Sequence, residues 1–200
     1  MEQSKRDLSQ TADSVINAGW VIPILPQGSV FEKHSVVITD GRIQRVVPHR
    51  EADQIATKQI FDLPNHAVLP GLVNCHGHAA MTLFRGIADD QPLHSWLQKH
   101  IWPAEKKYVS EDFVRDGGEL AIAEMILSGT TTFSDMYFFP EIMAELVVSK
   151  GIRCQLSFPI FDFQSPWASD SKDCISRGLA LTDRFKHRDL VKVIFGPHSV

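Results

Sequence analysis

The residues best suited to chemistry in this sequence are two histidines separated by one residue, His76 and His78. Residues two apart in a β-strand point to the same face, so a strand here would project both imidazoles together. Neutral imidazole binds zinc, iron and similar divalent ions. The apolar stretch 67–75, interrupted by Pro70-Gly71, predicts a buried strand that ends at this pair. The pair therefore predicts a metal site at a strand end, with a chance pair of solvated histidines as the alternative.

Two histidines do not complete a catalytic zinc site, which usually has three or more protein ligands and one open position. His198, at another predicted strand end, is the third candidate, and it could instead contact substrate or cap the strand. Glu105 follows in the long stretch 79–109, which we expect to be irregular, and there it could accept two hydrogen bonds from a vicinal diol or lie solvated. Trp102 offers a flat face for a base or anchors the loop. Asp135 would either orient a ligand histidine or cap the chain's exit from a strand.

The elements that must position these residues differ between the two parts of the chain. Residues 13–69 carry strand signals, above all Asp40-Gly41 between the β-branched runs 35–39 and 42–47, which predicts a hairpin. Residues 20–25 predict a further strand. From Gly71 onward strands alternate with helices, which predicts parallel strands joined by right-handed crossovers.

The helices and strands of the second part have clear boundaries. A helix over 110–128 is capped by Ser110, and its Gly117-Gly118 pair weakens it unless close packing requires the glycines. The remaining predictions are strands over 130–136, 153–160 and 190–195, and helices over 140–150 and 171–186. Four such units fall short of the roughly 250 residues of a closed eight-fold barrel, so half of a barrel is favoured over an open four-stranded sheet.

Composition excludes several classes of function. The 200 residues carry 20 basic and 24 acidic side chains, a net charge of -4, which argues against nucleic acid as a partner. The polar N-terminus lacks the apolar core of a signal peptide, and no apolar run approaches the roughly 20 residues of a membrane span, so no membrane partner is expected. Three widely spaced cysteines predict neither a disulfide framework nor a metal knuckle, and the reducing cytoplasm is the simplest setting.

The segment Leu69–Thr82, LPGLVNCHGHAAMT, followed by Phe84-Arg85-Gly86, resembles the amidohydrolase superfamily, in its adenosine- and chlorotriazine-type branch. The motifs WPAE at 102–105, GTTTFSDM at 129–136 and GPH at 196–198 extend the resemblance in order and spacing. Within that branch the chain is most similar to the methylthioadenosine/S-adenosylhomocysteine deaminases. The resemblance covers nearly all of residues 13–200.

This resemblance implies an α/β fold, a (β/α)₈ TIM-type barrel whose first four βα units occupy residues 70–200. Residues 13–69 would form the first part of a small β-sandwich, after an N-terminal tail over 1–12. It also implies one divalent metal, zinc or iron, bound by His76 and His78. Glu105 matches the position that holds the ribose hydroxyls, and His198 matches a substrate-contacting histidine rather than a metal ligand.

The implied activity is hydrolytic deamination of the adenine ring of 5'-methylthioadenosine, S-adenosylhomocysteine or adenosine, which yields the inosine analogue and ammonia. The partner would be a small nucleoside, and the family resemblance suggests a homo-oligomer. The acid–base residues and remaining metal ligands of the family come from the fifth to eighth strands, so we expect them beyond residue 200. The alternatives are a guanine or cytosine deaminase, a triazine hydrolase, or a non-enzymatic metal-binding scaffold on a barrel-like fold.

Overall fold

The computed structural model describes residues 11–199, with the side chain of the last of these left aside. The chain divides into two compact units, Met1–Pro70 and Gly71–Val200. Each unit has its own sheet and its own buried core. The candidate site residues all belong to the second unit.

The first unit contains a four-stranded sheet in the order β3-β2-β1-β4. Its strands are β1 Ser14–Val21, β2 Phe31–Thr39, β3 Arg42–Pro48 and β4 Ile60–Val68, and the short helix α1 spans His49–Ala52. β1 pairs antiparallel with β2 and parallel with β4, and β2 pairs antiparallel with β3. The described residues of this unit form one sheet, so the β-sandwich remains a prediction.

The structure of this unit agrees with the predicted hairpin and differs from the predicted strand. The hairpin prediction is confirmed, because Asp40 and Gly41 join β2 to β3 with φ of 51° and 67°. The strand predicted over residues 20–25 is wrong, since β1 lies earlier and ends at Val21. Pro23 offers no N–H for a ladder, which is a physical reason for the strand to stop before it.

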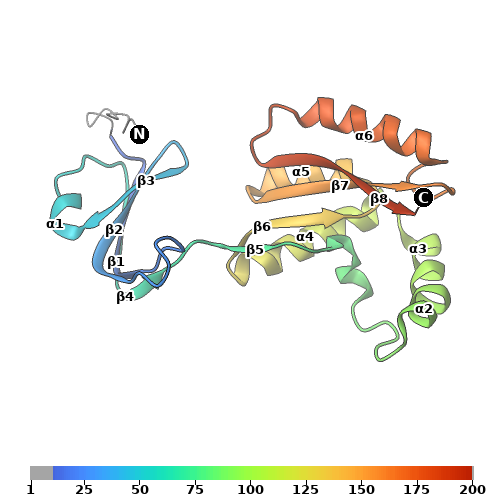
Figure 1. The fold of residues 1–200 in the computed structure, drawn as a ribbon, viewed down its shortest axis with the longest axis horizontal. Helices are drawn as coiled ribbons and strands as arrows, with labels where there is room; N and C mark the ends of the chain where they lie inside the picture. Colours follow the sequence, from blue (N-terminus) through green and yellow to red (C-terminus); the bar gives the residue numbers. More distant parts are fainter. Residues whose placement is uncertain (1–10, 200) are drawn as a thin grey trace. The chain divides into compact units, whose positions relative to one another are not determined.

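The second unit is built on the parallel sheet β5-β6-β7-β8, whose arrows point the same way in Figure 1. Its strands are β5 Leu72–Asn74, β6 Thr130–Met136, β7 Arg153–Phe161 and β8 Val191–Ser199. The helices α4 Glu111–Leu127, α5 Pro140–Lys150 and α6 Ser171–Phe185 alternate with these strands. The predicted strand–helix alternation of this region is therefore confirmed.

The main core lies between these helices and one face of the sheet. Alternate strand residues such as Phe133, Cys154 and Leu156 are buried against it. The helices contribute Ala121, Ile122, Met143, Ala144, Leu146, Val147, Leu181 and Phe185. The predicted cap of α4 is present, since Ser110 Oγ accepts a hydrogen bond of 3.1 Å from the N–H of Phe113.

The strand predicted at the start of this unit is wrong. The stretch 67–75 is not one buried strand: β4 ends at Val68, and Leu72 and Val73 of β5 are each 61% exposed. The reason is that β5 lies at the edge of the sheet, with β6 as its one partner among the described strands.

The stretch 79–109 is largely helical rather than irregular. It contains the 3₁₀ helix η1 Ala79–Phe84, α2 Leu93–Trp96, the π-helical turn η2 Leu97–Ile101 and α3 Trp102–Tyr108. Such short pieces leave little periodicity in a sequence. Figure 1 shows α2 and α3 at the end of the sheet toward which the strands point. Within residues 11–199 no helix is long and apolar enough to cross a membrane.

Candidate metal and substrate site

The histidine pair lies in the turn that joins β5 to η1, beyond the last strand residue, Asn74. The prediction that a strand projects both rings is therefore wrong, and the turn itself sets their directions. Asn74 Oδ1 accepts a hydrogen bond of 3.2 Å from the N–H of His76. A Cβ at Gly77 would lie 3.1 Å from the carbonyl oxygen of Ser134, so the turn passes close to β6.

Three hydrogen bonds fasten this turn to the end of β6. The N–H of Met136 donates to the carbonyl of Gly77 at 3.2 Å. The Nδ1 of His78 contacts the carbonyl of Met136 at 2.6 Å, and the N–H of Ala79 donates to Asp135 Oδ1 at 2.7 Å. The backbone of Gly77, the ring of His78 and the backbone of Ala79 are thus held by two consecutive residues at the end of β6.

The hydrogen bond to Met136 determines the tautomer of the neutral His78 ring. A carbonyl oxygen can only accept, so Nδ1 must carry the proton, and Nε2 of the neutral ring keeps a free lone pair. Metal-binding histidines commonly donate their other ring N–H to a backbone carbonyl or carboxylate. The rings of His76 and His78 have centroids 5.2 Å apart and are inclined at 79°. This arrangement suits two ligands of one divalent ion.

Two imidazoles fit such an ion chemically but do not complete its coordination. Within the described part of the chain, no group of three or more histidine, cysteine or acidic side chains is arranged to hold a metal. His198 does not join the pair in such a group.

The side chain of Asp135 supports the turn by contacting the turn's backbone rather than the histidine ring. Its side chain is 2% exposed and accepts the N–H of Ala79, whereas the ring of His78 is held by the neighbouring carbonyl of Met136. Burial raises the pKa of Asp135 to about 6, against the opposing effect of the Ala79 hydrogen bond and the nearby His78. The buried partner of this carboxyl is therefore the N–H of Ala79, a backbone group of the turn.

Glu105 lies on α3 and meets a residue that the sequence did not single out, Tyr137. The hydroxyl of Tyr137 donates to Glu105 Oε1 at 2.9 Å, and the Tyr137 ring lies 6.5 Å from the ring of His78. Burial raises the pKa of Glu105, and burial together with this carboxylate raises the pKa of Tyr137. Tyr137 follows the predicted strand 130–136 directly, and that strand-end position was the available signal.

His198 lies near the end of β8, at the same C-terminal end of the parallel strands as the histidine pair, which follows the opposite edge strand, β5. Its ring is 5.2 Å from that of Phe161, which is 5.9 Å from Phe138, and Phe138 is 5.1 Å from Tyr137. A row of aromatic rings thus connects His198 to the neighbourhood of Glu105. Trp102, the other substrate candidate, is 52% exposed at the start of α3.

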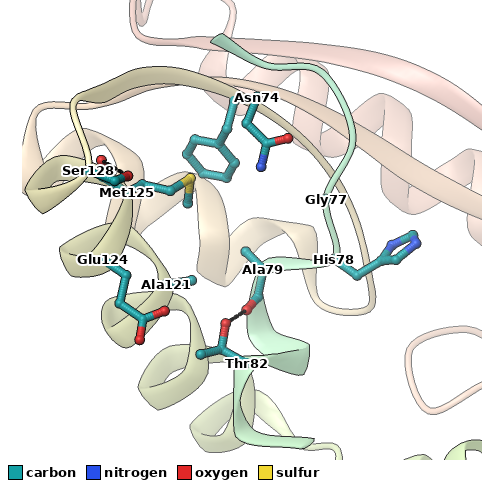
Figure 2. Close-up of a pocket in the computed structure, with 10 residues that line it drawn as sticks. Asn74, Gly77, His78, Ala79, Thr82, Ala121, Glu124, Met125 and Ser128 are labelled. Carbon is teal, nitrogen blue, oxygen red and sulfur yellow. Dashed lines mark hydrogen bonds between the residues drawn. The ribbon is translucent and has the colours of Figure 1, made fainter. Parts of the chain in front are cut away.

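A pocket of about 400 Å³ also borders the turn, between it and α4. It is lined by Asn74, Gly77, His78, Ala79, Thr82, Ala121, Glu124, Met125, Ser128 and Phe133. Figure 2 shows the imidazole of His78 pointing away from the other lining side chains. The imidazole of His78 and the pocket therefore lie on different sides of the turn, and we assign no substrate to the pocket.

Comparison with known proteins places this arrangement in a family. Residues 67–200 match the amidohydrolase family. The chain belongs to that family. Amidohydrolase membership implies a TIM-barrel-type α/β fold, of which the parallel sheet of the second unit is a part.

Individual amidohydrolases are similar over nearly the whole chain. The 5-methylthioadenosine/S-adenosylhomocysteine deaminase of Saccharophagus degradans is 51% identical over 189 residues, 94% of this chain and 42% of that protein. The 5'-deoxyadenosine deaminase of Methanosarcina mazei is 41% identical over 94% of this chain and 43% of its own length.

A solved adenosine deaminase from Xanthomonas campestris with bound zinc superimposes with a TM-score of 0.92 at 40% identity, covering 94% of this chain and 43% of that one. The chain thus spans less than half the length of these relatives.

Proposed function

We propose that this chain forms the first half of a metal-dependent deaminase that acts on the adenine ring of 5'-methylthioadenosine or S-adenosylhomocysteine. In this proposal residues 71–200 supply four of the eight βα units of a barrel, and further sequence supplies the rest. The names of the similar proteins support the substrate class, and the zinc of the X. campestris enzyme supports the metal.

The observation that carries the proposal is the fixed ring of His78. Its Nδ1–H is committed to the carbonyl of Met136, which leaves Nε2 to bind a metal beside His76. Tyr137 lies between this ring and Glu105, a half-buried carboxylate on α3. A group that binds a metal and a group that accepts hydrogen bonds from a diol are therefore neighbours.

Each side chain has a distinct part in the proposed reaction. When bound, a divalent ion lowers the pKa of water and so supplies a nucleophile near neutral pH. His76 and His78 hold that ion in place. Glu105 accepts the ribose hydroxyls and fixes the nucleoside, and His198 contacts the substrate from β8. These two residues orient the substrate rather than make or break bonds.

The test measures ammonia release and bound metal together in the native-length protein. Methylthioadenosine, S-adenosylhomocysteine and adenosine are compared, with and without a chelator. The variant His78→Ala is compared with His187→Ala, which removes an exposed histidine from the turn after α6. We expect His78→Ala to lose both metal and turnover, and His187→Ala to keep both.

The outcomes separate the parts of the proposal. Full metal content in His78→Ala would reject the ligand assignment. Chelator-sensitive ammonia release would support the deaminase, and the relative rates would identify the nucleoside. A protein that holds metal but deaminates none of the three substrates would refute this substrate class and direct the search to free bases and triazines.

A further inference from the structure

Tyr137 is the residue at this site whose role is not yet assigned. Its side chain is 7% exposed, yet its hydroxyl reaches a carboxylate on a helix 32 residues earlier in the chain. It packs against Phe138 and lies near the ring of His78. A buried hydroxyl of this kind usually needs one partner, and here that partner is Glu105.

We propose that Tyr137 is a positioning residue that holds the carboxylate of Glu105 in the orientation that receives the ribose hydroxyls. This inference rests on the proposed function, because it assumes that Glu105 binds the sugar. It adds a second residue to sugar recognition, one that never touches the substrate.

The geometry explains why Glu105 needs such support. Its helix, α3, has seven residues and follows the π-helical turn η2. A glutamate side chain has three rotatable bonds and loses entropy when it is held in one arrangement. The hydroxyl of Tyr137 occupies one acceptor position of Oε1, which leaves Oε2 and the remaining lone pair of Oε1 for a diol.

Tyr137 is well placed to impose this orientation because it is anchored by β6. In the residue before it, Met136, the carbonyl accepts a hydrogen bond from the His78 ring and the N–H donates to the carbonyl of Gly77. The same strand end therefore fixes both the metal-binding ring and the proposed sugar-binding carboxylate. The spacing between the His78 ring and the Glu105 carboxylate would be set by these two adjacent residues.

The test is Tyr137→Phe in the native-length, metal-loaded enzyme, which removes the hydroxyl and keeps the ring. The matched control is Tyr108→Phe, because Tyr108 is the other tyrosine of this chain and lies 53% exposed on α3 itself. Adenosine is compared with 2',3'-dideoxyadenosine, which lacks both hydroxyls. Metal content and melting temperature are recorded for each protein.

We expect Tyr137→Phe to lower kcat/KM for adenosine roughly tenfold, as for loss of a hydrogen bond to a charged group, mostly through KM. For the dideoxy substrate the loss should stay below about twofold, and Tyr108→Phe should change neither. In a Glu105→Gln background, Tyr137→Phe should add little, because the two residues act as one unit.

Equal losses for both substrates, or no loss for adenosine, would overturn the inference, and so would a variant that no longer folds, since the hydroxyl would then serve the fold. A wild-type enzyme that deaminates neither these two substrates nor methylthioadenosine and S-adenosylhomocysteine would instead refute the proposed function.

Discussion

The two adjacent glycines of α4 allow the packing behind the histidine turn to be tested with two matched substitutions. A Cβ at Gly117 would lie 2.4 Å from the carbonyl oxygen of Ala80, a backbone atom two residues after His78. A Cβ at Gly118 would meet the Cδ1 of Leu146 at 2.7 Å and the Cε of Met143 at 2.8 Å. The first obstacle is backbone, whereas the second is the ends of two flexible side chains.

The two alanine variants should therefore differ in stability. Each gains about 1 kcal/mol of helix propensity over glycine. Forcing a methyl group against packed atoms costs about 1–3 kcal/mol, at the upper end where backbone must move and at the lower end where side chains can turn. We expect Gly117→Ala to lose about 2 kcal/mol of unfolding free energy and Gly118→Ala to change little.

Thermal unfolding of the native-length protein measures this difference. A loss of about 2 kcal/mol lowers the melting temperature by about 4–8 °C for a domain of 150–250 residues, and by less when a longer unit unfolds together. Metal content gives a second readout, because displacement of Ala80 reaches His78 through two residues, so Gly117→Ala should also bind metal more weakly. The reasoning would be refuted if the two variants melted together, or if Gly118→Ala were the less stable.

Three further predictions concern single contacts of the second unit. Ser110→Ala removes the N-terminal cap of α4 and should cost about 1 kcal/mol in denaturant unfolding, without a change in metal content; an unchanged midpoint would contradict the cap. Asp135→Ala leaves the buried N–H of Ala79 unpaired, so it should cost about 1–3 kcal/mol and weaken metal binding in a titration; metal affinity equal to wild type would separate this carboxyl from the turn. Glu105→Gln should raise KM for ribosylated substrates while bound metal stays constant, and unchanged kinetics would return Glu105 to a surface role.

The elements after Ser110 could be predicted from sequence because their signals are local. The helix α4 starts after a serine whose side chain caps it, and α5 begins at Pro140 and ends before Gly151, which has φ of 76°. The strand β6 was predicted with the bounds that it has, 130–136. Caps, proline and left-handed glycine act within one helical turn, so the sequence alone specifies them.

The segment 79–109 could not be predicted in this way. Its helices are four to seven residues long, and one of them is a π-helical turn, so no apolar period has room to develop. The contact that gives Glu105 its environment joins residues 32 apart. Sequence spacing carries no information about such a pair, and the structure was needed to reveal Tyr137.

The histidine pair lies in an irregular turn rather than in a strand, and this has a structural consequence. In a continuous strand through residue 78, the backbone N–H and C=O groups of the pair would form hydrogen bonds to neighbouring strands. Both side chains would then stand perpendicular to the sheet. Instead the strand ends at Asn74, and the turn passes close to β6 at Gly77. A Cβ added to Gly77 would lie only 3.1 Å from the carbonyl oxygen of Ser134. That close approach brings Nδ1 of His78 to the carbonyl of Met136. The irregular turn therefore achieves what a regular strand would not: it fixes the ring of His78 so that Nε2 remains free for a metal.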